Sequence, residues 1–82
     1  MNEEFKGQFE ALLSKYTELM TGTNGEELEE KVRYWVLYTY IAKTMPALAK
    51  HWNALYPKGK EQMMEIISEI KVLNENHRNK RD

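Results

Sequence analysis

The sequence contains no cysteine, which excludes disulfide bonds, thiolate nucleophiles and cysteine-bound metals. It contains only two histidines, His51 and His77, and neither has a second metal-binding side chain at helical spacing. Both are therefore interpreted as edge or surface residues. We expect no metal and no cofactor.

Long apolar runs are also absent. No stretch approaches the roughly 18 apolar residues that mark a membrane-spanning helix. The first residues, MNEEFKGQFEALL, are acidic and amphipathic, which is not the pattern of a signal peptide. We therefore expect a cytoplasmic protein that does not associate with membranes.

Catalytic motifs are missing as well. Ser14 and Ser68 have no histidine at neighbouring helical spacing that could activate them. Gly22, Gly25 and Gly59 do not form a phosphate-binding loop, because no strand precedes them and no Gly-Lys-Ser or Gly-Lys-Thr follows. We therefore expect a protein that is not an enzyme and has no small-molecule substrate.

The sequence does contain several amphipathic helical segments. It has 82 residues, of which 41% are hydrophobic and 30% charged, a composition that suits one packed domain. Apolar residues recur with a helical period in four segments: 3–20, 25–44, 46–56 and a last one starting near 60. We expect one helical domain over residues 1–75. Residues 76–82 contain no apolar side chain, which predicts a flexible basic C-terminal tail.

The ends of these helices have recognisable signals. Asn2 is a suitable N-cap for the first helix, and Gly22 suits a left-handed helix end. Thr23 and Glu26 have the spacing of a capping box at the start of the second helix. Pro46 predicts a break after the second helix, because the residue before a proline avoids helical geometry.

The second helix is apolar almost all the way round, with the sequence VRYWVLYTYIA over residues 32–42. A helix of this kind needs cover on two sides. We therefore predict an all-α fold, a compact bundle of three long helices and one short helix, with helix 25–44 central. Trp35 and Leu12 each lie in the middle of an apolar stripe and are expected to be buried.

The short third helix cannot cover the second face of helix 25–44 completely, so a dimer or another protein is expected to cover it. Tyr and Trp are enriched at protein interfaces. The sequence thus predicts a small protein-interaction module, such as a regulator or inhibitor of a larger protein, that binds a protein or a second copy of itself. The expected interaction face contains Tyr34, Leu37, Tyr38, Ile41, Trp52 and Tyr56. The alternative interpretation of these residues is that they are simply core.

The uneven charge leaves a second hypothesis open. Residues 1–41 contain eight Glu and four Lys or Arg, whereas residues 42–82 contain eight Lys or Arg and five Asp or Glu. A nucleic-acid-binding regulator would use the basic half, with possible contacts from Lys58, Lys60, Arg78, Lys80 and Arg81. The glutamates at positions 61, 65 and 69 and the pI of about 6.1 argue against this alternative.

Overall fold

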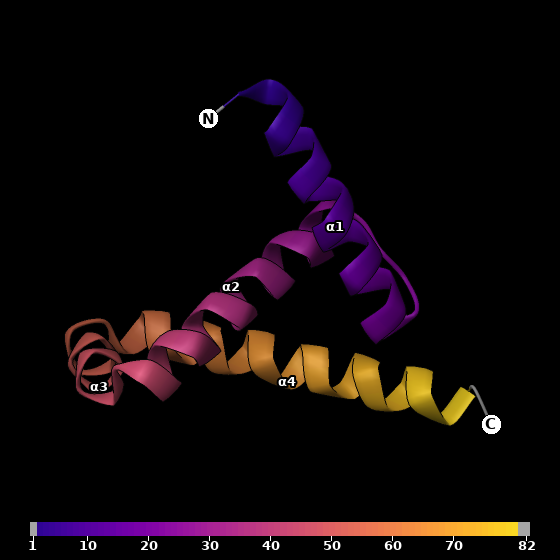
Figure 1. The fold of residues 1–82 in the computed structure, drawn as a ribbon. Coiled ribbons are helices and arrows are strands. Elements are labelled where there is room, and N and C mark those ends of the chain that lie inside the picture. Colours follow the sequence, from indigo (N-terminus) through magenta and orange to yellow (C-terminus); the bar gives the residue numbers. More distant parts are fainter. Residues whose placement is uncertain (1, 81–82) are drawn as a thin grey trace.

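The computed structural model describes residues 2–80 and contains four helices joined by short links (Figure 1). They are α1 (Glu3–Thr21), α2 (Glu26–Thr44), α3 (Pro46–Leu55) and α4 (Pro57–Lys80). The predicted all-α bundle of three long helices and one short one is therefore confirmed. No helix in the described part of the chain is long and apolar enough to cross a membrane.

Helix α1 begins and ends as its sequence predicts. The side chain of Asn2 accepts a hydrogen bond of 2.7 Å from the backbone N–H of Phe5. Gly22 takes the left-handed conformation, with φ at 85°, and its N–H donates to the carbonyl oxygen of Glu18. The predicted capping box is wrong, because α2 has no side-chain hydrogen bond at its start. The Thr21 hydroxyl instead lies 2.9 Å from the carbonyl oxygen of Thr23 and holds the loop there.

Two single-residue links connect α2, α3 and α4. Met45 and Tyr56 each precede a proline, and their backbone angles are nearly the same, with φ and ψ at −138° and 68° and at −127° and 72°. The expected break at Pro46 is confirmed, and Figure 1 shows α3 turning away from α2. The expected start of the last helix near residue 60 is wrong, since α4 begins at Pro57. Proline suits this first helical position because its missing N–H is not needed there.

The core lies mainly between α2 and α4. Its buried members are Val32, Met63, Ile66 and Ile70. Trp35 packs against this core but is only partly buried, so the expectation that it is buried is met only in part. Around the cluster lie further partly buried side chains: Leu13, Met20, Tyr38 and Ile67.

Helix α1 packs on the rest of the chain with an unexpected face. Its buried residues are Thr17 and Thr21, whose hydroxyls donate to the carbonyl oxygens of Leu13 and Thr17, each at 2.8 Å. At 3.6 residues per turn, these threonines lie roughly 100–140° from the centre of the apolar stripe on α1. The expectation that Leu12 is buried is therefore wrong, and its side chain is 63% exposed.

The last turns of α4 contact the end of α1. The helix continues through residues 76–80, which the sequence suggested were a tail. His77 is half-buried and lies so close to Gly22 that a Cβ on this glycine would be 2.6 Å from the imidazole Nδ1. The flexibility of this segment stays a prediction, and residues 81–82 lie outside the described part of the chain.

Candidate functional site

An apolar groove runs along one side of α2, bounded by α3 and the first half of α4. Its volume is about 460 Å³. The residues that line it are Tyr34, Leu37, Tyr38, Ile41, Leu48, Ala49, Trp52, Gly59, Gln62, Met63 and Ile66. We call it the α2–α3 groove. Gln62 is its only lining residue with a fully polar side chain, so its walls suit an apolar ligand surface.

A second groove lies on the other side of α2, against α1. Its volume is about 630 Å³. The residues that line it are Phe9, Leu12, Leu13, Tyr16, Arg33, Val36, Leu37 and Tyr40. We call it the α1–α2 groove. Leu37, 57% exposed, lines both grooves and makes them one continuous surface, which we call the open face.

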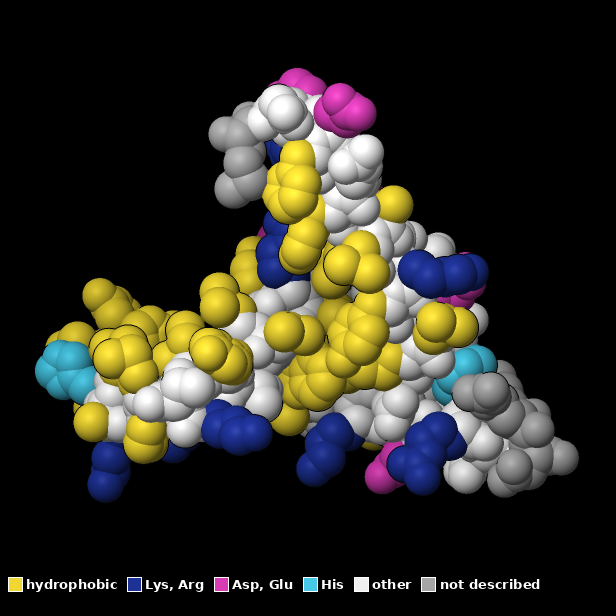
Figure 2. All heavy atoms as spheres, in the orientation of Figure 1, with side chains coloured by type: hydrophobic (Ala, Val, Ile, Leu, Met, Phe, Trp, Pro, Cys, Tyr) yellow, Lys and Arg dark blue, Asp and Glu magenta, His cyan; other side chains and the backbone are white. Residues whose placement is uncertain are grey.

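The structure brings most of the predicted interaction residues together. Five of the six line the α2–α3 groove, and the exception is Tyr56. The ring of Tyr56 lies beside the groove residue Trp52, with 5.9 Å between the ring centroids. Figure 2 shows hydrophobic side chains extending from α1 across α2 towards α3.

The α1 side of the open face was missed by the sequence interpretation. Leu12 was expected to be buried, yet it is exposed together with its stripe neighbours Phe9 and Tyr16. The signal that could have identified them is the pair Thr17 and Thr21, which allows a different face of α1 to be buried. Because threonine hydroxyls can donate to carbonyls of their own helix, such residues are compatible with burial.

Hydrogen bonds fix the aromatic side chains around α2. The Tyr38 hydroxyl donates to Asn53 Oδ1 at 3.0 Å, and the Tyr38 and Trp52 ring centroids are 6.0 Å apart. Tyr34 donates to the carboxylate of Glu30. This hydrogen bond raises the pKa of Tyr34 above its ordinary value of 10.0. The α2–α3 groove is therefore held in shape before any partner binds.

An ion pair joins α2 to α4 beside the core. Lys31 Nζ lies 3.0 Å and 3.2 Å from the two carboxylate oxygens of Glu69. The hydrogen bond to Glu69 is the main cause that raises the pKa of Lys31 above 10.5. Because this pair is partly exposed, it orients the two helices more than it stabilises them.

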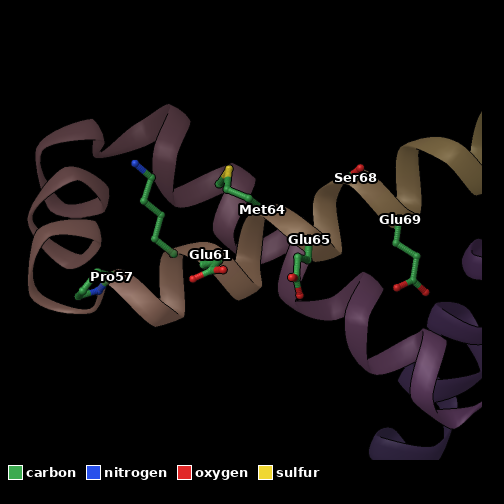
Figure 3. A pocket seen from close by; sticks show the side chains of 7 residues that line it. Pro57, Glu61, Met64, Glu65, Ser68 and Glu69 are labelled. Carbon is green, nitrogen blue, oxygen red and sulfur yellow. The ribbon is translucent and has the colours of Figure 1, made fainter.

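A shallow hollow on the outer side of α4 offers no comparable site. Figure 3 shows its glutamates at successive turns of the helix, together with Met64 and Ser68. Among the described residues, no three His, Cys, Asp or Glu side chains converge as metal ligands. The hollow combines exposed carboxylates with one lysine, Lys60, and no hydrogen bond within the described residues joins the Ser68 hydroxyl to one of these carboxylates.

The possible nucleic-acid contacts do not form one surface. Lys58 and Lys60 lie in the first turn of α4, whereas Arg78 and Lys80 belong to its last turn. At 1.5 Å of rise per residue, the positions of Lys60 and Arg78 are about 27 Å apart along the helix. Arg81 lies outside the described residues.

Comparison with known proteins places the chain in a family. Residues 3–80 match the family described as "Protein of unknown function (DUF2573)", and the chain belongs to it. The chain is also 56% identical over 80 residues to "Uncharacterized protein YusU" of Bacillus subtilis (strain 168). That alignment covers 98% of this chain and 84% of the relative. No solved structure matches the chain.

Proposed function

We propose that this protein is a non-catalytic interaction module that binds another protein, or a second copy of itself, through the open face. One observation carries the proposal: α1 packs inward with Thr17 and Thr21, and most of its apolar stripe is left exposed. The exposed stripe contains five large hydrophobic side chains, Phe5, Phe9, Leu12, Tyr16 and Leu19. Contiguous exposed apolar surface of this kind marks interaction sites in folded proteins.

The open face also has the composition of a binding surface. It is rich in Tyr and Trp, which supply large contact areas and a polar tip. Several of its rings are held in place by contacts such as the Tyr38–Asn53 hydrogen bond. Binding therefore costs little further ordering of these side chains. Regulation or inhibition of a larger protein in the cytoplasm is an activity that such a face can perform without catalytic groups.

Nucleic-acid binding is the less well supported alternative. The basic residues proposed for it are divided between the two ends of α4, and Glu61, Glu65 and Glu69 lie between them. Phosphate groups would be repelled by these carboxylates. Of the residues that line the two grooves of the open face, Arg33 is the single lysine or arginine, so the walls of the grooves themselves are apolar rather than basic.

Site-specific photo-crosslinking in living cells tests the proposal. Leu37 and Val72 are each replaced by p-benzoylphenylalanine in chains expressed in Bacillus subtilis, the organism of the relative. Both positions are helical and similarly exposed, at 57% and 51%, but Val72 lies outside both grooves. We expect a light-dependent product of higher mass from position 37 and none from position 72.

A second substitution links the product to the whole face. Leu12→Glu in the chain labelled at position 37 should remove the product, because Leu12 lines the far side of the open face. If position 37 gives no product while the chain is folded, or if Leu12→Glu leaves the product unchanged, the proposed function is wrong.

A further inference from the structure

We infer that the occupant of the open face is a second copy of this chain, with α1 of each copy lying across the open face of the other. The inference rests on the proposed function and adds to it the identity of the partner. Three observations support it: the excess surface area of a single chain, the separation of charge along the sequence and the direction in which α1 projects.

A single chain exposes too much surface for its mass. A monomeric protein of 9.8 kDa is expected to expose about 5,200 Å². This chain exposes 6655 Å². The radius of gyration is 14.5 Å, compared with about 12 Å for a typical domain of this length. The excess is about 1,500 Å² of exposed surface per chain, or about 3,000 Å² for two chains. Permanent homodimers bury a total area in this range.

Charge is divided between the two surfaces that would meet. Helix α1 contains four Glu and two Lys, and the other four Glu of residues 1–30 lie in the first turns of α2. Residues 31–60, which include most of α2 and all of α3, contain six Lys or Arg and neither Asp nor Glu. Two α1 helices placed side by side would repel each other, as would two α2–α3 surfaces. Pairing of α1 with the α2–α3 surface of another copy brings opposite charges together.

The arrangement of the helices allows this pairing to occur twice in one dimer. The N-terminal half of α1 projects from the rest of the molecule, and α3 lies at the end of the other arm (Figure 1). Residues of α2, α3 and α4 in that arm line the α2–α3 groove. Hydrophobic side chains cover both arms on the side shown in Figure 2. A two-fold axis would place each α1 against the partner's groove, so both apolar stripes would be covered in a closed assembly.

Two complementary charge variants test this pairing. The first is Glu4→Lys with Glu10→Lys in α1. The second is Lys50→Glu with Lys58→Glu, two lysines adjacent in sequence to the groove residues Ala49 and Gly59. All four side chains are exposed, and none has an ion-pair partner among the described residues. Circular dichroism establishes that each variant keeps its helices.

Light scattering and sedimentation equilibrium then give the solution mass. We expect the unaltered chain to have twice the 9.8 kDa chain mass. Each variant alone should dissociate with a Kd raised roughly tenfold or more, because like charges then face each other at both contacts. An equimolar mixture should recover the double mass. In the mixed dimer, a lysine-bearing α1 meets a glutamate-bearing groove, and the other contact is unaltered.

Two results would overturn the inference. One is a monomeric mass for the unaltered chain at every concentration up to its solubility limit. The other is failure of the mixture to associate when the unaltered chain does. If the chain is monomeric but position 37 still crosslinks to a different protein, the partner is not a second copy of this chain. The inferred dimer is then wrong, and the proposed function stands. If the chain is monomeric and position 37 gives no crosslinked product, both the inferred dimer and the proposed function are wrong.

Discussion

Asn74 Nδ2 donates a hydrogen bond of 2.9 Å to the backbone carbonyl oxygen of Met20, a residue 54 positions earlier in the chain. Met20 lies in the last turn of α1, where carbonyl groups have no partner within the helix. The bond therefore satisfies an unpaired acceptor and joins α4 to the end of α1. Because α1 is held at this end, its N-terminal half projects in a defined direction.

Replacement of Asn74 should loosen this junction. For Asn74→Ala we expect a loss of about 1 kcal/mol in the free energy of unfolding, since one partly buried hydrogen bond is lost. In a domain of this size the melting temperature should fall by about 4–8 °C. Thermal unfolding followed by circular dichroism measures the change. The matched control is Asn76→Ala, an exposed position on the same helix. Equal melting temperatures for the two variants would show that the bond contributes nothing.

The core between α2 and α4 should be the most sensitive part of the chain. Ile70 is 1% exposed, so Ile70→Ala should cost about 2–5 kcal/mol through lost burial and the cavity it leaves. Val72, two residues further along α4, is half exposed, and Val72→Ala should change the stability by less than about 0.5 kcal/mol. Urea unfolding of both variants gives the comparison. Similar losses at the two positions would mean that the core is wrongly assigned.

Replacement of Gly22 and of Gly7 by alanine should change the stability of the chain in opposite directions. Gly22 has φ at 85°, and a Cβ there would come within 2.6 Å of His77, so Gly22→Ala should destabilise the chain by about 1 kcal/mol. Gly7 lies within α1 with nothing within 4 Å of a new Cβ, so Gly7→Ala should stabilise it by up to about 1 kcal/mol. Differential scanning calorimetry measures both. A stabilising Gly22→Ala would contradict the assigned turn.

Stability should fall when the pH rises above about 10. The pKa values of Lys31 and Tyr34 are both raised in the folded chain, chiefly by hydrogen bonds to Glu69 and Glu30. The folded state therefore retains protons that the unfolded state releases near the ordinary pKa values of 10.5 and 10.0. By linkage, this contribution is complete below those values and is lost as the pH rises through the raised ones.

Denaturant unfolding at a series of pH values checks this dependence. The double variant Lys31→Met with Tyr34→Phe removes both groups, and its stability should fall less steeply between about pH 9 and 11 than that of the unaltered chain. A fall of the same steepness in both chains would assign the pH dependence to other groups.

Local signals in the sequence predicted most of the fold. Asn2, Gly22 and Pro46 act through backbone geometry that depends on only a few neighbouring residues, and each has its expected role. The last helix was predicted to start near residue 60, whereas α4 starts at Pro57. Proline is suited to the first turn of a helix, and Gly59 fits there because Trp52 leaves little room for a side chain, with a Cβ only 3.0 Å from its ring.

The candidate site was predicted only in part, for a physical reason. The groove beside Tyr38 and Trp52 follows from the number of apolar residues around α2, which the sequence displays directly. The face of α1 that packs inward depends on tertiary contacts at Thr17 and Thr21, and a helical stripe does not reveal these. The hydrophobic effect favours burial of Leu12, yet it does not specify whether the cover comes from the same chain or from another.

The central claim is that a second copy covers α1, and amide hydrogen exchange of residues 5–12 tests it most directly. Exchange is measured by mass spectrometry over a range of protein concentrations, with residues 63–70 of the core as the internal reference. We expect protection of residues 5–12 to rise with concentration and to follow the solution mass, because the helix is covered only in the dimer. Rapid exchange of residues 5–12 at every concentration, with residues 63–70 still protected, would contradict the claim.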